Sequence, residues 1–273
     1  MKNQIAGLLF ILCCAQIHAQ ENNYADVNGV KIYYEIHGEG EPLVLLHGFT
    51  MSHKMWDGWI EDFSKKYKII LPDLRGHGNS TNPSNEFTHK ESAKDIYGLL
   101  NLLKIDKFNA MGFSSGGMTL THMATMDTTR IKSMVLIGST SFFPESCREI
   151  QRNASYENAT EEQLKYWNSQ HPRGEDQIKN IINQFRQMAD SFEDMNFTSP
   201  YLSSIKCETF IIHGDRDAFF PAEIPLNSYN SIPNSYLWII PNFGHSGIDK
   251  SSIWGDVFFK TVDKFFSGEW SNE

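Results

Sequence analysis

Apolar and polar positions follow two periods along this chain, which predict strands and helices in turn. Short, nearly continuous apolar runs are typical of strands buried on both faces of a sheet, and apolar residues three and four apart are typical of amphipathic helices. The pattern predicts the α/β class, with a mostly parallel, doubly wound sheet of about eight strands. Strands are expected at 24–35 (a hairpin of two), 42–46, 67–71, 108–113, 133–137, 209–213 and 236–240, and helices at 53–63, 87–105, 115–126, 222–230 and 253–266.

The first two strands carry a hairpin signal that the later ones lack. Asn28-Gly29 stands between alternating apolar residues of the segment 24–35. Asn-Gly favours the two-residue turns that join antiparallel strands. We therefore expect an antiparallel pair at the start of an otherwise parallel sheet.

The alternation of strands and helices is interrupted between Ser141 and Ile205. Two segments here, 161–167 and 176–192, have helical spacing and polar faces. An insertion of this kind, after one sheet strand and before the next, predicts a helical cap. The expected domains are a core formed by residues 20–140 and 206–273 and a cap formed by residues 141–205.

The first 19 residues are typical of a secretory signal peptide. Lys2 supplies a short positive region, residues 5–15 an apolar core, and Ile17-His18-Ala19 a small-residue cleavage site. The apolar core is too short for a stable transmembrane anchor. The sequence thus predicts export to the periplasm or the medium, and a buried N-terminal helix of the domain is the alternative.

The cysteines leave two further alternatives. Cys13 or Cys14 could be acylated in a lipoprotein, but the preceding Phe10-Ile11-Leu12 lacks the small residue of such a cleavage site, which favours export without a lipid anchor. Cys147 and Cys207 remain after cleavage and could pair in an oxidising compartment. Two separate buried thiols are the favoured interpretation.

Composition limits the kinds of molecule that the protein is expected to bind. The net charge of −9 and the pI near 5.6 provide no basic field for phosphate backbones, so nucleic acid is not an expected partner. A small neutral or weakly charged molecule fits better. No two histidines stand at metal-ligand spacing on one predicted helix and no Cys-x-x-Cys occurs, so neither a metal nor a cofactor is expected.

The stretch Gly112-Phe113-Ser114-Ser115-Gly116-Gly117 contains the motif that indicates a candidate nucleophile. It joins a predicted strand to a predicted helix. A serine on such a sharp turn has strained backbone angles and needs glycine two residues before and two residues after it. Ser114 meets this requirement, whereas Ser115 would need glycine in place of Phe113. Ser114 is therefore the candidate nucleophile.

A serine hydroxyl needs a histidine base and a carboxylate that orients the base. Candidates follow two late strands: Gly214-Asp215-Arg216-Asp217 after one and Gly244-His245 after the next. The carboxyl ends of parallel strands lie at one edge of the sheet, where functional groups gather. The order along the chain is serine, aspartate, histidine.

With these motifs the chain resembles the α/β-hydrolases, of the small esterase, enol-lactonase and cofactor-free haloperoxidase type, over nearly all of the mature chain. The resemblance implies that Ser114 is the nucleophile, His245 the base and Asp217 the acid. Asp215 is the alternative acid. The implied oxyanion donors are the backbone N–H groups of Phe49 and Ser115. The matching motifs are His47-Gly48-Phe49, Asp73 to Ser80, Gly112 to Gly117, Gly214 to Asp217 and Gly244-His245.

Several polar residues in or near these motifs are expected to have structural roles. His47 is expected to brace its loop, and His213 to be a hydrogen-bonded residue at a strand end. Asp73 and Arg75 belong to a turn beside the site, which lacks the lysine and spacing of a phosphate loop. Asp249 lies on the wrong side of His245 for the family's chain order.

The expected activity is that of an exported serine hydrolase that cleaves a small carboxylic ester or lactone through an acyl-enzyme. Perhydrolase or haloperoxidase-like activity, carbon–carbon bond hydrolysis and amide hydrolysis are alternatives on the same fold, and a ligand-binding protein without catalysis is the alternative of another class. A small-molecule acyl substrate is the expected partner. The candidate pocket residues are Trp56, Phe142, Trp167 and Phe219.

Overall fold

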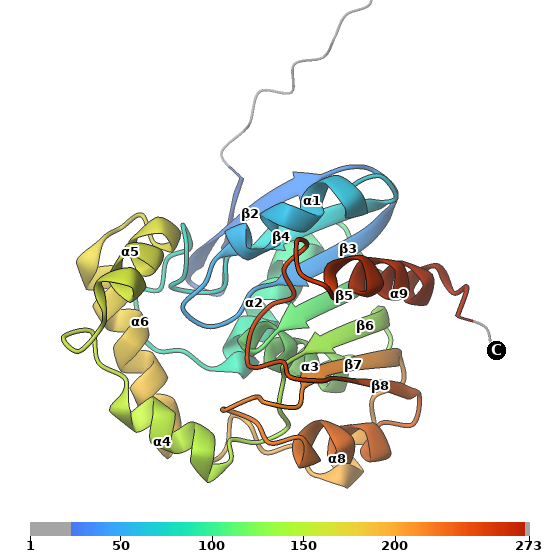
Figure 1. The fold of residues 1–273 in the computed structure, drawn as a ribbon. Coiled ribbons are helices and arrows are strands. Elements are labelled where there is room, and N and C mark those ends of the chain that lie inside the picture. Colours follow the sequence, from blue (N-terminus) through green and yellow to red (C-terminus); the bar gives the residue numbers. More distant parts are fainter. Residues whose placement is uncertain (1–22, 271–273) are drawn as a thin grey trace, which may run out of the picture.

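The computed structural model describes residues 23–270, which build one sheet with helices on both faces (Figure 1). The sheet has eight strands in the order β1-β2-β4-β3-β5-β6-β7-β8. Strands β3 to β8 run parallel to one another, and β1 and β2 form the antiparallel edge. The predicted fold class is confirmed. The strands are β1 (Tyr24–Val27), β2 (Val30–His37), β3 (Glu41–Leu46), β4 (Tyr67–Pro72), β5 (Phe108–Phe113), β6 (Ile131–Ile137), β7 (Glu208–Gly214) and β8 (Ser235–Ile240).

The predicted hairpin is confirmed at the start of the described chain. Val27 and Val30 close it, with Asn28 at φ 47° and Gly29 at φ 78°. Positive φ at both central residues is the requirement of a type I′ turn, whose twist matches that of the flanking strands. This local chemistry explains why the fold opens with an antiparallel pair.

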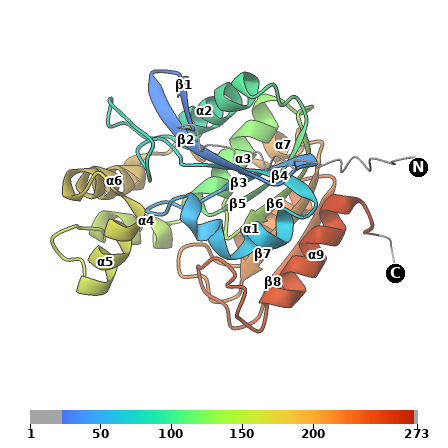
Figure 2. The same ribbon diagram turned by 90° about the horizontal axis from the view of Figure 1, so that it is seen from above.

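Two layers of helices cover the sheet, as Figure 2 shows in the view from above. On one face α1 (Asp57–Phe63) and α9 (Gly255–Ser267) pack through Trp59, Phe63 and Phe258. The opposite face carries α2 (His89–Leu102), α3 (Ser115–Met126) and α8 (Glu223–Ser231). Central strand β5 is buried along its whole length between these layers. A strand buried on both faces explains the nearly continuous apolar run that leads into the glycine-serine motif.

Residues 145–187, in the segment between β6 and β7, form helices beside the sheet, at the left of Figure 1. The sequence predicted two helices here, and the structure has more. The apolar spacing missed α4 because its buried residues are Cys147, Arg148 and Gln151, of which only the cysteine is apolar. The expected helix 176–192 is too long, since it ends as a 3₁₀ turn. The elements are α4 (Glu145–Asn153), α5 (Glu161–Gln170), α6 (Glu175–Gln187), η2 (Met188–Asp190) and α7 (Ser199–Leu202).

Helix boundaries follow capping residues that the apolar pattern does not see. Helix α2 was expected from residue 87 and begins at His89, because the Thr88 side chain accepts a hydrogen bond from the N–H of Glu91. A short η1 (His53–Trp56) precedes α1 where one helix was expected. Ser52 caps it in the same way. Capping thus moves the ends of the elements and leaves their order unchanged.

The predicted signal peptide, with Cys13 and Cys14, lies outside the described residues. Among the helices of residues 23–270, none combines the length and the apolar character that a membrane crossing requires.

Candidate active site

The loops after four neighbouring parallel strands meet at one edge of the sheet. Phe49 follows β3, Ser114 follows β5, Asp217 follows β7 and His245 follows β8. These strands are adjacent or separated only by β6. Parallel strands place their carboxyl ends side by side, and so residues far apart in sequence come together here.

Ser114 occupies the strained turn that the glycine pattern predicts. Its backbone angles are φ 49° and ψ −117°, and its N–H donates to the Ile137 carbonyl at 2.8 Å. A Cβ on Gly112 would lie 2.5 Å from the Gly116 carbonyl carbon, and one on Gly116 would lie 2.3 Å from the Leu46 oxygen. Both distances are far below contact between atoms. The two glycines therefore allow β5, α3 and β3 to approach closely enough to form the turn.

His245 lies within hydrogen-bond distance of the Ser114 hydroxyl. Its Nε2 is 3.0 Å from Ser114 Oγ, and its Nδ1 is 2.7 Å from Asp217 Oδ2. A carboxylate accepts at Nδ1, so the neutral imidazole keeps its proton there and presents a lone pair at Nε2. This arrangement can take the proton of the serine hydroxyl.

Asp217 is held so that one of its oxygens faces His245. Its other oxygen, Oδ1, accepts the backbone N–H groups of Phe219 and Phe220 at 2.8 and 3.0 Å. Burial opposes ionisation of this carboxyl, but the hydrogen bonds from His245 and Phe220 outweigh it, and the pKa of Asp217 is lowered. The group is therefore a carboxylate at neutral pH. Its 2.7 Å hydrogen bond fixes the orientation of the His245 ring.

The other two aspartates considered from the sequence accept backbone N–H groups and do not hydrogen-bond His245 among the described residues. Asp215 is exposed and accepts the N–H of Phe243 at 3.3 Å, without a hydrogen bond to His245 among the described residues. Asp249 accepts the N–H of Ser251 at 2.6 Å. The first contact joins the loop after β7 to the loop after β8, and the second closes a local turn. Neither carboxylate contacts the His245 ring among the described residues.

The backbone N–H groups of Phe49 and Ser115, which are the expected oxyanion donors, are unpaired in the part of the chain that the structure describes. Among residues 23–270, neither has a hydrogen-bond acceptor from the backbone or a side chain. Ser115 is the first residue of α3, where unpaired N–H groups and the helix dipole favour negative charge. Two free donors beside Ser114 could hold an oxyanion.

The Phe49 loop is braced by His47, as expected. The N–H of Leu74 donates to His47 Nε2 at 2.9 Å, and His47 Nδ1 donates to the Gly48 carbonyl at 2.8 Å. Burial lowers the pKa of His47, which keeps the imidazole neutral and both hydrogen bonds intact. His47 thus fixes the loop that carries the Phe49 N–H and contributes no second base.

The turn that contains Asp73 and Arg75 is a structural element beside the site. Asp73 is fully buried and accepts the N–H groups of His53 and Asn79 at 2.7 and 2.8 Å. Arg75 pairs with Asp95 of α2 through two hydrogen bonds of 2.7 and 2.9 Å. With all of these groups partnered, the turn offers no phosphate cradle.

The four aromatic residues predicted to line a pocket lie in different surroundings. The Phe219 ring centre is 4.5 Å from that of His245, so Phe219 borders the site. Trp56 is buried in the core under α1, and Trp167 is half-buried on α5. Phe142 is 41% exposed and pairs with Asn196 in an isolated bridge. Only Phe219 of these four has a ring contact with His245 among the described residues.

Sequence analysis missed a second hydrogen-bonded serine, histidine and aspartate set beside the first. His89 joins Ser115 to Asp194 across the core and the cap. No local signal marks these residues, because the contacts span 26 and 105 positions of the chain.

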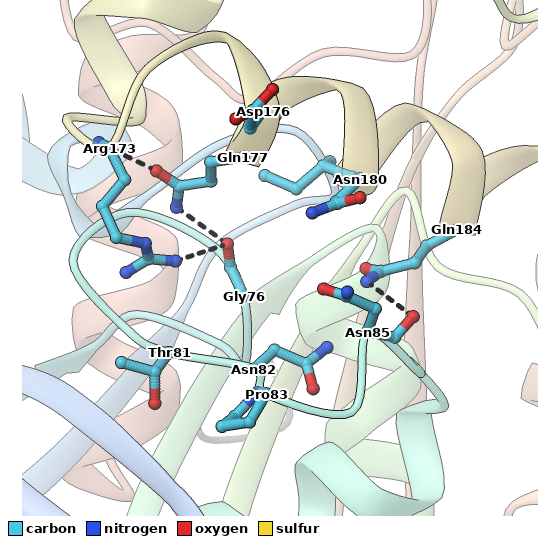
Figure 3. A pocket seen from close by; sticks show the side chains of 11 residues that line it. Gly76, Thr81, Asn82, Pro83, Asn85, Arg173, Asp176, Gln177, Asn180 and Gln184 are labelled. Carbon is cyan, nitrogen blue, oxygen red and sulfur yellow. Dashed lines mark hydrogen bonds between the residues drawn. The ribbon is translucent and has the colours of Figure 1, made fainter.

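The cap is anchored to the core around the polar pocket in Figure 3, which has a volume of about 350 Å³. The side chain of Arg173 donates to the carbonyl of Gly76, and Gln177 donates to the same oxygen at 2.8 Å. Gln184 of α6 donates to the carbonyl of Asn85 at 3.0 Å. Helix α6 is thereby fixed to the segment 76–85. None of the predicted site residues lines this pocket.

The described residues add neither a disulfide nor a metal-binding cluster to this site. Cys147 and Cys207 are separate buried thiols, as favoured from the sequence. Residues 23–270 contain no group of three or more His, Cys, Asp or Glu side chains arranged to hold a metal ion.

Known proteins resemble the chain over most of its length. A curated 2-hydroxy-6-oxo-6-(2'-aminophenyl)hexa-2,4-dienoic acid hydrolase from Metapseudomonas resinovorans is 22% identical over 251 residues, covering 83% of this chain and 85% of the relative. The human serine hydrolase BPHL is 27% identical over 233 residues, covering 81% and 78%. The solved enol-lactonase of Burkholderia xenovorans LB400 has a TM-score of 0.73 at 23% identity, covering 89% of this chain and 99% of its own.

The family comparison agrees with the topology. The family model described as alpha/beta hydrolase fold matches residues 41–162, which run from β3 through the glycine-serine turn into the cap. The sheet order, the antiparallel edge and the strained serine turn after β5 complete the correspondence. The chain therefore has the α/β-hydrolase fold.

Proposed function

We propose that this protein is a serine hydrolase that cleaves a small carboxylic ester or lactone through an acyl-enzyme. The observation that carries the proposal is the position of Ser114 on a strained turn, with its Oγ 3.0 Å from Nε2 of His245. The 2.7 Å contact between His245 and the Asp217 carboxylate supplies the orientation that a base requires.

In the first half of the reaction Ser114 Oγ attacks the carbonyl carbon of the ester. The hydroxyl proton moves to His245 Nε2, and a tetrahedral intermediate forms. His245 then gives this proton to the leaving alkoxide oxygen as the carbon–oxygen bond breaks. The acyl group remains on Ser114.

Water completes the cycle by the same route. His245 takes a proton from the water, whose oxygen attacks the acyl carbon, and the proton is passed to Ser114 Oγ as the acid product leaves. Asp217 stays ionised throughout and stabilises the imidazolium. In a lactone the leaving oxygen is part of the same molecule, and a hydroxy acid is the product.

The backbone N–H groups of Phe49 and Ser115 are the proposed oxyanion donors. Their lack of other partners among the described residues supports this role. Each such donor contributes on the order of 3 kcal/mol to lowering the barrier. Because both belong to the main chain, loop geometry and not side-chain type sets their position.

The proposed substrate pocket lies between the Phe49 loop and the cap. Phe49 stacks on Phe185 of α6 at 5.5 Å between ring centres, and Phe219 lies between Phe185 and His245. Aromatic walls on this side of Ser114 favour an apolar acyl group of modest size. Phe219→Ala should raise KM for short acyl esters more than it lowers kcat.

The test is a substrate panel on purified protein. We expect p-nitrophenyl acetate and butyrate, or simple lactones, to be hydrolysed, with kcat reduced at least about a thousandfold in Ser114→Ala. Asp249→Asn is the control, because Asp249 serves only its own turn. The proposal fails if folded wild-type protein and Ser114→Ala hydrolyse every member of the panel equally.

Carbon–carbon bond hydrolysis is the second candidate, since one relative is named as a hydrolase of a 2-hydroxy-6-oxo-dienoic acid. A panel member of that type distinguishes it from ester cleavage. Amide and peracid substrates cover the other chemistries of the fold. Binding without turnover of any member would instead favour a ligand-binding protein.

Export is also proposed, from the signal-like residues 1–19. N-terminal sequencing of the protein recovered from its source cells tests it. A mature chain that starts at Gln20 supports export with cleavage after Ala19. An acylated N-terminal cysteine would replace that proposal with lipid anchoring, and an intact Met1 would contradict both.

A further inference from the structure

His89 connects Ser115 to Asp194 with the same geometry that connects Ser114 to Asp217. His89 Nε2 is 3.0 Å from Ser115 Oγ, and His89 Nδ1 is 2.7 Å from Asp194 Oδ2. The corresponding distances around His245 are 3.0 and 2.7 Å. Two serine, histidine and aspartate sets therefore start from neighbouring residues of one turn.

The second set joins three separate parts of the fold. His89 is the first residue of α2, Ser115 is the first residue of α3, and Asp194 lies in the cap segment between η2 and α7. His122 of α3 also contacts the Asp194 carbonyl oxygen, through Nε2 at 2.7 Å. The cap segment is thus fixed to the two helices that begin beside Ser114.

The direction of the hydrogen bonds follows from the charge on Asp194. Its carboxylate also accepts the backbone N–H groups of His89 and Lys90, at 2.9 and 3.2 Å. Burial opposes ionisation, but His89 and His122 together hold the pKa of Asp194 well below its usual range. An ionised Asp194 accepts a hydrogen bond from His89 Nδ1–H. In the tautomer that keeps only this proton, Nε2 is the acceptor for the Ser115 hydroxyl.

Ser115 is poorly placed to be a second nucleophile. It is the first residue of a regular helix and is 3% exposed, and its hydroxyl is occupied by His89. The strained backbone and the paired glycines belong to Ser114. The chemical group of Ser115 that faces the reaction is its N–H, which has no other partner among the described residues.

We propose that Asp194 and His89 are positioning residues that hold Ser115, and with it the peptide N–H that binds the oxyanion, in register with Ser114. This inference rests on the proposed function. It assigns the cap a part in the chemistry, because a cap residue fixes the orientation of an oxyanion donor through one imidazole. We call the hydrogen bonds that join His89 to Asp194 and Ser115 the tether. Loss of the tether leaves the Ser115 N–H in the chain but allows its peptide to rotate away from the developing charge.

The kinetic arm compares Ser115→Ala, His89→Gln and Asp194→Asn with wild type on the best substrate of the panel. Each should lower kcat about tenfold or more with KM within about twofold, since the oxyanion forms only on the way to the transition state. Ser115→Thr, which keeps a hydroxyl, should recover most of the loss.

Two control variants remove comparable buried groups from the same helices without touching Ser115. Thr121→Val deletes a hydroxyl of α3 that donates to the Gly117 carbonyl. Asp95→Asn alters the buried carboxylate of α2 that pairs with Arg75. Both should lower the unfolding temperature and leave kcat of the folded protein close to wild type. Equal losses of kcat in the controls and the tether variants would overturn the proposal.

A double-variant cycle tests whether the three residues act as one unit. Ser115→Ala combined with Asp194→Asn should lower kcat no further than the more severe single variant does. If the two substitutions multiply their effects on kcat, Ser115 and Asp194 act independently, which would contradict the tether.

A spectroscopic arm does not depend on activity and separates this inference from the proposed function. In the Ser114→Ala protein, ¹⁵N NMR of His89 should show a protonated Nδ1 and an unprotonated Nε2, and the Nε2 shift should move on adding Ser115→Ala. The opposite tautomer, or an unmoved Nε2, would overturn the tether even if Ser114 proves catalytic. The expected spectrum in a protein without Ser114-dependent turnover would sustain the tether and reject only the oxyanion role.

Discussion

Asp217 gives one carboxylate oxygen to the backbone of its own loop and the other to His245, 2.7 Å away. Asp215, two residues earlier, instead accepts the backbone N–H of Phe243 in the loop after β8. Asp217→Asn should therefore lower kcat by about three to four orders of magnitude, because an amide no longer enforces the required tautomer. Asp215→Asn should leave kcat nearly unchanged. Steady-state kinetics of the two variants checks this, and the reverse order would move the acid to Asp215.

The two glycines of the strained turn, Gly112 and Gly116, should tolerate no side chain. The Cβ of Gly116→Ala would lie 2.3 Å from the Leu46 carbonyl oxygen, a backbone atom that cannot rotate aside. We expect a loss of unfolding free energy of about 1–3 kcal/mol or more, together with loss of activity. Gly58→Ala in α1, where a Cβ meets nothing within 4 Å, should stabilise by roughly 0.5–1 kcal/mol. Urea denaturation measures both, and a fully stable, active Gly116→Ala protein would refute the packing argument.

Acid should weaken the fold through His171. Its Nδ1 accepts the N–H of Gly78 at 3.0 Å, and burial lowers its pKa from 6.5 to about 4. Between these values the unfolded chain binds a proton that the folded chain excludes. The contribution to unfolding free energy is thus fully present above pH 6.5 and is lost as the pH falls toward 4.

Denaturation curves across this range test the effect. His171→Gln should flatten the slope of unfolding free energy against pH by up to about 1.4 kcal/mol per pH unit. Gln184→Ala, which removes an uncharged contact between the cap and the core, should lower the whole curve without changing its slope. Parallel curves for wild type and His171→Gln would show that His171 does not exclude the proton.

The two internal thiols should be inert until the protein unfolds. Burial raises the pKa of Cys147 to about 12 and that of Cys207 to about 11. Almost no thiolate is then available at neutral pH. Iodoacetamide followed by peptide mapping should find both residues unmodified in native protein and alkylated in urea. Rapid modification of either in the native state would contradict its burial.

The order of elements was predictable because the central strands, such as β5, are buried on both faces and carry nearly continuous apolar runs. The Asn28-Gly29 turn was predictable because its chemistry is local. Helix α4 was not, since two of its three buried residues, Arg148 and Gln151, are polar and carry no apolar signal. Arg148 is held in the cap by a hydrogen bond to the Phe143 carbonyl. Apolar periodicity identifies elements that pack on a core and misses those that pack through polar groups.

The same limit applies to the site. Ser114, Asp217 and His245 were selected from motifs at strand ends, and the structure brings them within hydrogen-bond distance. His89 and Asp194 have no motif, because their relation to Ser115 exists only once the cap segment folds onto α2 and α3. Pocket residues were equally hidden: Phe219 reaches His245, while Trp56 packs in the core.

The central claim is that Ser114 is the nucleophile, and covalent labelling tests it most directly. Intact-protein mass spectrometry after treatment with a fluorophosphonate should show one adduct, which peptide mapping assigns to Ser114 and which is absent from Ser114→Ala. An unlabelled but folded wild-type protein, or an adduct that persists in Ser114→Ala, would contradict the account.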